Sequence, residues 1–138
     1  MVNSENVFSF FRDCVATQES KVFFLLAILC VVMIVDFLLG SVAAWRNPNI
    51  NFNSSEGING IIRKIGSLVV MLIVIPLSVL VPGGTGIAAL SVLYIGYIVM
   101  EFASILENLR KLGVDISPLQ KFAEKVLGAN GGKGNGEH

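Results

Sequence analysis

Three long apolar stretches dominate the pattern of hydrophobic and polar residues along this chain of 138 residues. The first stretch runs without interruption from Val22 to Trp45 and is bracketed by Lys21 and Arg46. As a helix it would cover roughly 36 Å, at about 1.5 Å per residue, whereas the hydrocarbon core of a bilayer is about 30 Å thick. The pattern therefore predicts a transmembrane helix over residues 22–45.

Two further apolar stretches predict transmembrane helices over residues 65–81 and 87–106. The second helix would cover roughly 26 Å, which is at the short end for a crossing. It contains Pro76, which is expected to kink it. Residues 82–86, with the sequence PGGTG, predict a tight turn rather than a phosphate-binding loop, because no Lys-Ser or Lys-Thr pair follows them.

Amphipathic segments flank these predicted spans. Isoleucines recur at helical spacing in residues 55–64, which predicts a helix lying along the membrane surface before the second span. A Ser-Pro pair opens residues 117–127, which predict a further amphipathic helix. The Phe-containing residues 1–21 predict a short interfacial segment, with a frayed terminus as the alternative. The glycine-rich residues 128–138 predict a disordered hydrophilic tail.

The sequence thus predicts an all-α membrane protein with about three transmembrane helices plus amphipathic interfacial helices. The composition agrees, because a chain with 54% hydrophobic and 14% charged residues does not fit a soluble domain of this size. Ten basic and ten acidic residues give no net charge, which argues against nucleic-acid binding. The single histidine, His138, leaves no partners for a catalytic triad or a zinc site. We expect Cys14 and Cys30 to be free thiols, and we expect no enzymatic activity, no cofactor and no metal.

The orientation of the chain in the membrane follows from its lysines and arginines. Positive residues gather in the loop over residues 46–64 and after the third span, whereas the turn over residues 82–86 has none. The positive-inside rule then places the loop and the C-terminus in the cytoplasm and the N-terminus outside, against the weak opposition of Arg12 and Lys21. The first apolar stretch is much longer than a signal-peptide core of about 7–15 residues, so we expect it to be retained.

Asp36 lies inside the first predicted span and is the first candidate functional residue. A carboxylate near the middle of a span costs roughly 2.5 to 3.5 kcal/mol on insertion scales, so it should face protein or water. Asp36, Gly40 and Ala44 are four residues apart and share one helix face, on which small residues permit close packing. We expect this face to pack against another helix or to line water. The alternative is a buried ion pair from Asp36 to Arg63 or Lys64.

A second set of candidates lies on one face of the third helix, at the spacing i, i+4, i+7 and i+11. This set is Tyr97, Glu101, Ser104 and Asn108. The face predicts a polar stripe near the membrane boundary. Its alternative is a helix that emerges into water, with Glu101 at the depth of the headgroups.

Three segments together resemble the toxin-secretion/phage-lysis holins, found mainly in phages of Gram-positive bacteria. The segments are residues 35–44 (VDFLLGSVAA), 54–64 (SSEGINGIIRK) and 101–109 (EFASILENL), the last followed by Leu112-Gly113 and Pro118. The resemblance covers roughly residues 20–127, so that residues 22–127 would form a transmembrane holin domain.

The resemblance implies a small phage protein that accumulates in the lipid bilayer of the host bacterial cytoplasmic membrane, forms homo-oligomers and opens holes at a set time. An endolysin, as the functional partner, or in some relatives a toxin, would then leave the cell. The resemblance implies that some polar and small residues matter for packing or pore formation: Asp36, Gly40, Arg63, Lys64, Glu101, Glu107 and Asn108. The helix faces add Ala44, Tyr97 and Ser104.

Two other classes of function stay open from the sequence. The first is an antiholin, a regulatory membrane partner that joins a holin and delays hole opening. The second is a small ion channel or transporter subunit, in which carboxylates within the membrane bind ions or protons. The chain shows no inverted repeat, which argues against a transporter.

Overall fold

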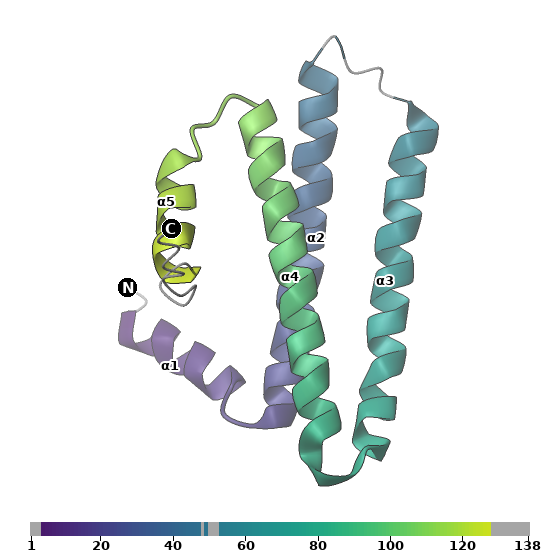
Figure 1. Ribbon diagram of the computed structural model, residues 1–138, viewed down its shortest axis with the longest axis vertical. Helices are drawn as coiled ribbons and strands as arrows, with labels where there is room; N and C mark the ends of the chain where they lie inside the picture. The colour runs from purple at the N-terminus through teal and green to yellow at the C-terminus, as the bar shows by residue number, and fades with distance from the viewer. Residues whose placement is uncertain (1–3, 48, 50–52, 128–138) are drawn as a thin grey trace, which may run out of the picture.

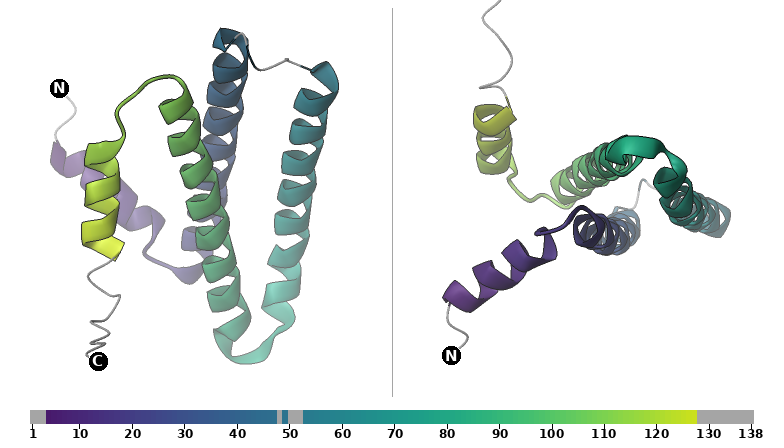
Figure 2. Two further views of the ribbon diagram at one scale, coloured as in Figure 1. Left: turned by 45° about the horizontal axis from the view of Figure 1, so that its top comes forward. Right: turned by 90° about the horizontal axis from the view of Figure 1, so that it is seen from below.

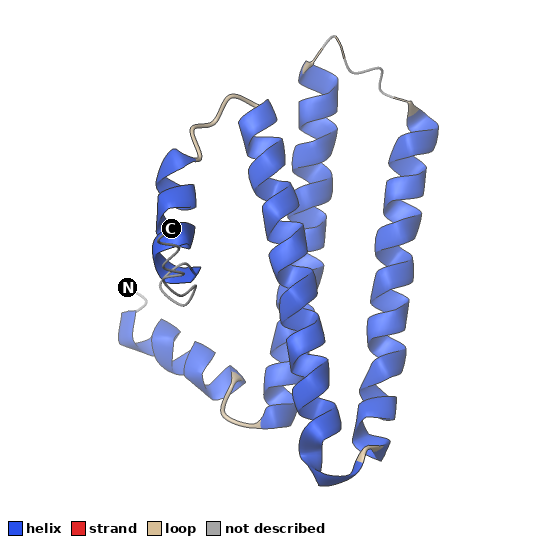
Figure 3. Ribbon diagram, in the orientation of Figure 1, coloured by secondary structure: helices blue, strands red, loops and turns tan. Residues whose placement is uncertain are grey.

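The computed structural model describes residues 4–47, 49 and 53–127, and every regular element within these residues is helical (Figures 1 and 3). The elements are α1 (Ser4–Cys14), α2 (Gln18–Arg46), α3 (Ser54–Leu80), the short 3-10 helix η1 (Pro82–Gly84), α4 (Thr85–Lys111) and α5 (Ser117–Leu127). Three helical segments, formed by α2, by α3 and by η1 with α4, are long and apolar enough to cross a membrane. The predicted all-α class with three membrane-spanning helices is therefore confirmed.

Each of the three long helices runs antiparallel to the one before it, so that α2 and α4 point in the same direction (Figures 1 and 2). α4 packs closely along α2, whereas α3 packs mainly on α4 and approaches α2 at few positions. The buried core lies between these helices and includes Leu29, Met33, Met71 and Tyr94. One pair of long helices is thus tightly packed, and α3 is the helix held by fewer contacts.

Local sequence explains where the long helices begin and end. The Thr17 hydroxyl accepts a hydrogen bond from the Ser20 amide and caps α2, and the Asn53 side chain caps α3 in a similar way. Gly83 and Gly84 have φ angles of 79° and 72°, values that favour glycine, and they make the tight turn between α3 and α4. The predicted turn over residues 82–86 is therefore confirmed.

The structure corrects the expected division of the second hydrophobic region. Residues 55–64 were expected to form a separate surface helix before a span over residues 65–81, but α3 is one continuous helix from Ser54 to Leu80. No proline interrupts the chain between Asn53 and Pro76, and Pro76 itself lies within the helix. The isoleucines of this segment lie on the exposed surface of α3, whereas its partly buried residues are Gly57, Gly60 and Lys64.

The two short helices lie outside the three-helix bundle (Figure 2). α1 falls within the predicted N-terminal segment, and α5 coincides with the predicted amphipathic helix over residues 117–127. The Ser117 amide donates a hydrogen bond to the Asp115 carboxylate over 3.0 Å before α5 begins. Hydrogen bonds from Ser117 hold the pKa of Asp115 below its ordinary value. The predicted disordered tail, residues 128–138, lies outside the described residues.

Candidate functional site

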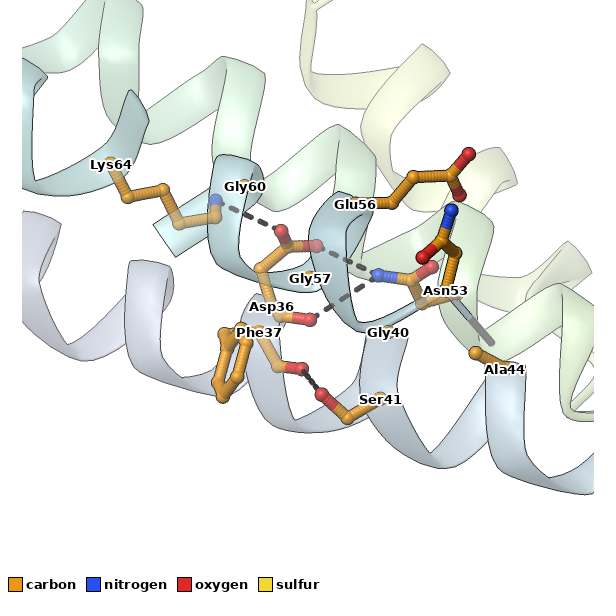
Figure 4. Close-up of a pocket in the computed structure, with 11 residues that line it drawn as sticks. Asp36, Phe37, Gly40, Ser41, Ala44, Asn53, Glu56, Gly57, Gly60 and Lys64 are labelled. Carbon is orange, nitrogen blue, oxygen red and sulfur yellow. Dashed lines mark hydrogen bonds and ion pairs between the residues drawn. The ribbon is translucent and has the colours of Figure 1, made fainter. Parts of the chain in front are cut away.

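A cluster of polar side chains joins the three long helices. Lys64 of α3 reaches two carboxylates. Its Nζ lies 3.0 Å from Oδ2 of Asp36 on α2 (Figure 4), and it is also bonded to Oε2 of Glu101 on α4. Asn108 of α4 donates from Nδ2 to Oδ1 of Asp36 over 2.9 Å. We call Asp36, Lys64, Glu101 and Asn108 the polar cluster. It ties α3 to the tightly packed pair α2 and α4.

Burial makes this pairing necessary. Asp36 is only 7% exposed, and an isolated carboxylate at such a position would carry a large desolvation cost. Lys64 and Asn108 together occupy both of its carboxylate oxygens. Two carboxylates nevertheless share one ammonium group, so the ionised polar cluster carries one excess negative charge. The polar cluster can hold the three helices together, because the Lys64 charge on α3 is paired with carboxylates of α2 and α4.

A groove of about 220 Å³ opens beside the polar cluster, with walls from α2 and α3 (Figure 4). Small residues form much of both walls, namely Gly40, Ser41 and Ala44 on α2 and Gly57 and Gly60 on α3. A Cβ atom at Gly40 would lie 3.3 Å from Nδ2 of Asn108, so the glycine leaves room for Asn108 to reach Asp36. We call this opening the cluster groove.

The structure brings together most, but not all, of the residues expected from the sequence. Asp36, Lys64, Glu101 and Asn108 form the polar cluster, and Gly40 and Ala44 line the cluster groove beside it. Of the two candidate ion pairs for Asp36, the structure contains the one with Lys64.

The remaining four candidates lie elsewhere. Arg63 is exposed on α3, and Ser104 is half-buried on α4. Tyr97 is half-buried and packs against the apolar core rather than joining the polar cluster. Glu107 is exposed and pairs with Lys111 one turn later, over 3.0 Å. The predicted polar stripe of α4 therefore contributes two of its members, Glu101 and Asn108, to the polar cluster.

Sequence reasoning missed several structural residues around the site. Gly57 and Gly60 were missed, although they share one face of α3 with the candidate Lys64 at the spacing i, i+3 and i+7, a signal that the isoleucine pattern obscured. Tyr94 is fully buried, and its hydroxyl donates to the Met71 carbonyl over 2.7 Å. This hydrogen bond links α3 to α4 within the apolar core.

Replacing Tyr94 by Phe should lower the free energy of unfolding by about 1 kcal/mol, because one buried hydrogen bond is lost while the ring stays. The measurement is unfolding of the full chain in mixed detergent micelles, followed by circular dichroism. Tyr97→Phe is the matched control, since this ring packs on the same core from a half-buried position. Equal stability of Tyr94→Phe and the wild type would contradict a stabilising role for the hydroxyl.

The described residues contain no group of three or more His, Cys, Asp or Glu side chains that could hold a metal ion. Cys14 and Cys30 are both free thiols, as the sequence predicted.

Three apolar helices tied together by a buried charged cluster define a small membrane protein with several spans. Comparison with known families gives a more specific result, because a model of the bacteriophage holin family matches residues 14–127. The chain therefore belongs to the bacteriophage holin family, which confirms the resemblance found in its sequence.

Two curated relatives of the chain are antiholins. The chain is 32% identical over 117 residues to a protein named antiholin from Bacillus phage phi29, covering 83% of this chain and 88% of the relative. An antiholin from Bacillus phage B103 is 30% identical over 105 residues, covering 76% of this chain and 78% of the relative. No solved structure matches the chain. The names of these relatives favour an antiholin over the holin that the sequence led us to expect.

Proposed function

We propose that this protein is an antiholin that acts in phage-induced lysis by joining holin assemblies and delaying their opening. Relatives named antiholin that align over most of both chains support this function. The structural observation that carries the proposal is the polar cluster, because Lys64 and Asn108 satisfy the buried Asp36 within one three-helix unit. A subunit in which Lys64 and Asn108 already bind the Asp36 carboxylate needs no water-filled hole to solvate that group.

The mechanism follows from the position of Lys64. In an open hole, polar side chains of the membrane helices would face water, whereas here Lys64 holds Asp36 and Glu101 against α3. Exposing them would require α3 to leave the other two helices and would break both ion pairs. We call a subunit closed when Lys64 holds both carboxylates within its own three helices. A closed subunit inserted among holin subunits would reduce the number of polar helix faces available to line a hole.

We propose the host cytoplasmic membrane as the site of action, with the N-terminus outside and the C-terminus in the cytoplasm. Arg46 ends α2, and Arg110 and Lys111 end α4, and these ends lie on the same side of the bundle (Figure 1). The turn over Pro82–Gly84 lies at the opposite end and carries no charge. The positive-inside rule favours the basic end in the cytoplasm.

A holin is the second candidate, and membership of the bacteriophage holin family is compatible with it. In that case the protein would open holes itself and release an endolysin. The polar cluster would then have to rearrange, so that Asp36 and Glu101 face water in an assembly of many copies. Family membership favours either of these lysis functions over an ion channel or a transporter.

The test is to express the chain together with an active holin of the family and a cytoplasmic endolysin in a bacterium. We expect lysis to begin later as the amount of this chain increases, since more assemblies contain closed subunits. An unrelated membrane protein with three spans, produced at the same level, is the control for crowding of the membrane. Earlier lysis would favour the holin, and lysis at the control time would refute the antiholin.

A further inference from the structure

We propose that a second copy of this chain docks at the cluster groove and that its Arg63 supplies the cation that the polar cluster lacks. This interface goes beyond the proposed function, since either an antiholin or a holin could use it. The argument rests on the charge of the groove, the position of Arg63 and the small residues on the groove walls.

The accepting side of the contact is negatively charged. Asp36 lines the cluster groove, and the ionised polar cluster has one more carboxylate than ammonium groups. Glu56 adds another carboxylate at the edge of the same groove. Uncompensated charge is costly at membrane depth, so a cation entering the groove would be favoured.

The donating side is Arg63, an exposed cation on the membrane helix α3. It lies between Gly60 and Lys64 along the helix, and both of these residues line the cluster groove. Two copies inserted in the same direction hold equivalent residues at the same depth. Arg63 of one copy is therefore level with the groove of its neighbour, and pairing there would remove the cost of an arginine facing lipid.

Small residues allow the neighbour to come close enough for this contact. Gly40 and Ala44 on α2 and Gly57 and Gly60 on α3 present little side-chain bulk to a helix that approaches the groove. In membranes, close backbone approach and polar contacts drive helix association. The groove combines both features at one depth.

The two sides of this contact are different surfaces. Adjacent residues on a helix point about 100° apart, so Arg63 projects to the side of the α3 face that carries Lys64. Arg63 is not among the residues that line the groove. The contact is therefore head-to-tail, and such contacts extend to further copies until a ring closes.

The first test measures self-association of the full chain in lipid vesicles by energy transfer between labelled copies. Arg63→Gln should weaken association by about tenfold, the change expected from losing one polar contact between membrane helices. Arg63→Lys, which retains the charge, should restore most of it. Arg46→Gln is the matched control, since Arg46 is an exposed arginine at the end of α2 and does not line the groove. Equal effects of Arg63→Gln and Arg46→Gln would overturn the proposal.

The second test determines which surfaces meet. Asp36 and Lys64 are paired on antiparallel helices, so Ser41 on the groove wall is level with the exposed Asn59 on α3. Copies carrying Ser41→Cys are mixed with copies carrying Asn59→Cys, after Cys14 and Cys30 are replaced by Ser. We expect oxidation to form a disulfide between unlike copies, and much less when Glu107→Cys, at an exposed position of α4 at a similar depth, replaces Asn59→Cys. A dominant cross-link between two Ser41→Cys copies would show a symmetric contact and would overturn the head-to-tail interface.

Discussion

Replacing Lys64 by Leu should lower the free energy of unfolding by roughly 3–5 kcal/mol, the usual cost of removing one partner from a buried ion pair. The substitution would leave the Asp36 and Glu101 carboxylates facing each other without the cation that now joins them. It would also remove the ion pairs that Lys64 of α3 makes with α2 and α4. Unfolding of the full chain in mixed micelles, at low protein concentration, measures the loss.

Two further variants make this result specific to the ion pairs. Lys64→Leu combined with Asp36→Asn and Glu101→Gln should recover most of the lost stability, because no unpaired charge remains buried. Arg63→Leu changes the neighbouring exposed residue and should have little effect on the stability of a single copy. If Lys64→Leu were as stable as Arg63→Leu, the polar cluster would not hold the helices together.

Replacing Gly86 by Ala should also destabilise the fold strongly, at or above the upper end of the about 1–3 kcal/mol that overpacking usually costs. A Cβ atom at this position would overlap the Ser78 carbonyl oxygen and would lie 2.9 Å from Cβ of Val81. The first atom belongs to the backbone of α3, so the hairpin between α3 and α4 would have to open. Thermal unfolding of the full chain measures the effect.

Gly96→Ala is the matched control for Gly86→Ala. Both glycines lie in α4, but a Cβ at Gly96 would meet no atom within 4 Å. This control should be neutral or slightly stabilising, because Ala is favoured over Gly in a helix. A similar loss in both variants would mean that the contact of Gly86 with α3 is not the cause.

The membrane-spanning helices could be predicted from hydrophobicity alone. Residues 22–45 and 87–106 fall within α2 and α4. A long apolar run between charged ends is compatible with few structures other than a membrane-spanning helix, so the hydrophobic pattern was sufficient here. The separation of residues 55–64 from the second span was wrong, since α3 continues through both. The average hydropathy of a segment does not show where a helix begins or ends, and α3 continues unbroken from its polar first turns into its apolar part.

The polar cluster could be predicted only in part. The cost of placing Asp36 in a membrane indicated that it needs a partner, but both Arg63 and Lys64 were available. These two residues point about 100° apart on one helix, so the choice depends on which face of α3 packs against α2 and α4. That rotation is set by tertiary contacts, including the hydrogen bond from Tyr94 to Met71, and the sequence pattern does not contain it.

The most direct test of the proposed antiholin function is to express the full chain alone in a bacterium and to follow the membrane potential with time. A cytoplasmic cell-wall hydrolase in the same cells reports any large hole. We predict that the potential stays normal and the hydrolase stays inside, even at high levels of the protein in the membrane. Sudden depolarisation with release of the hydrolase would contradict the antiholin and would identify the protein as a holin.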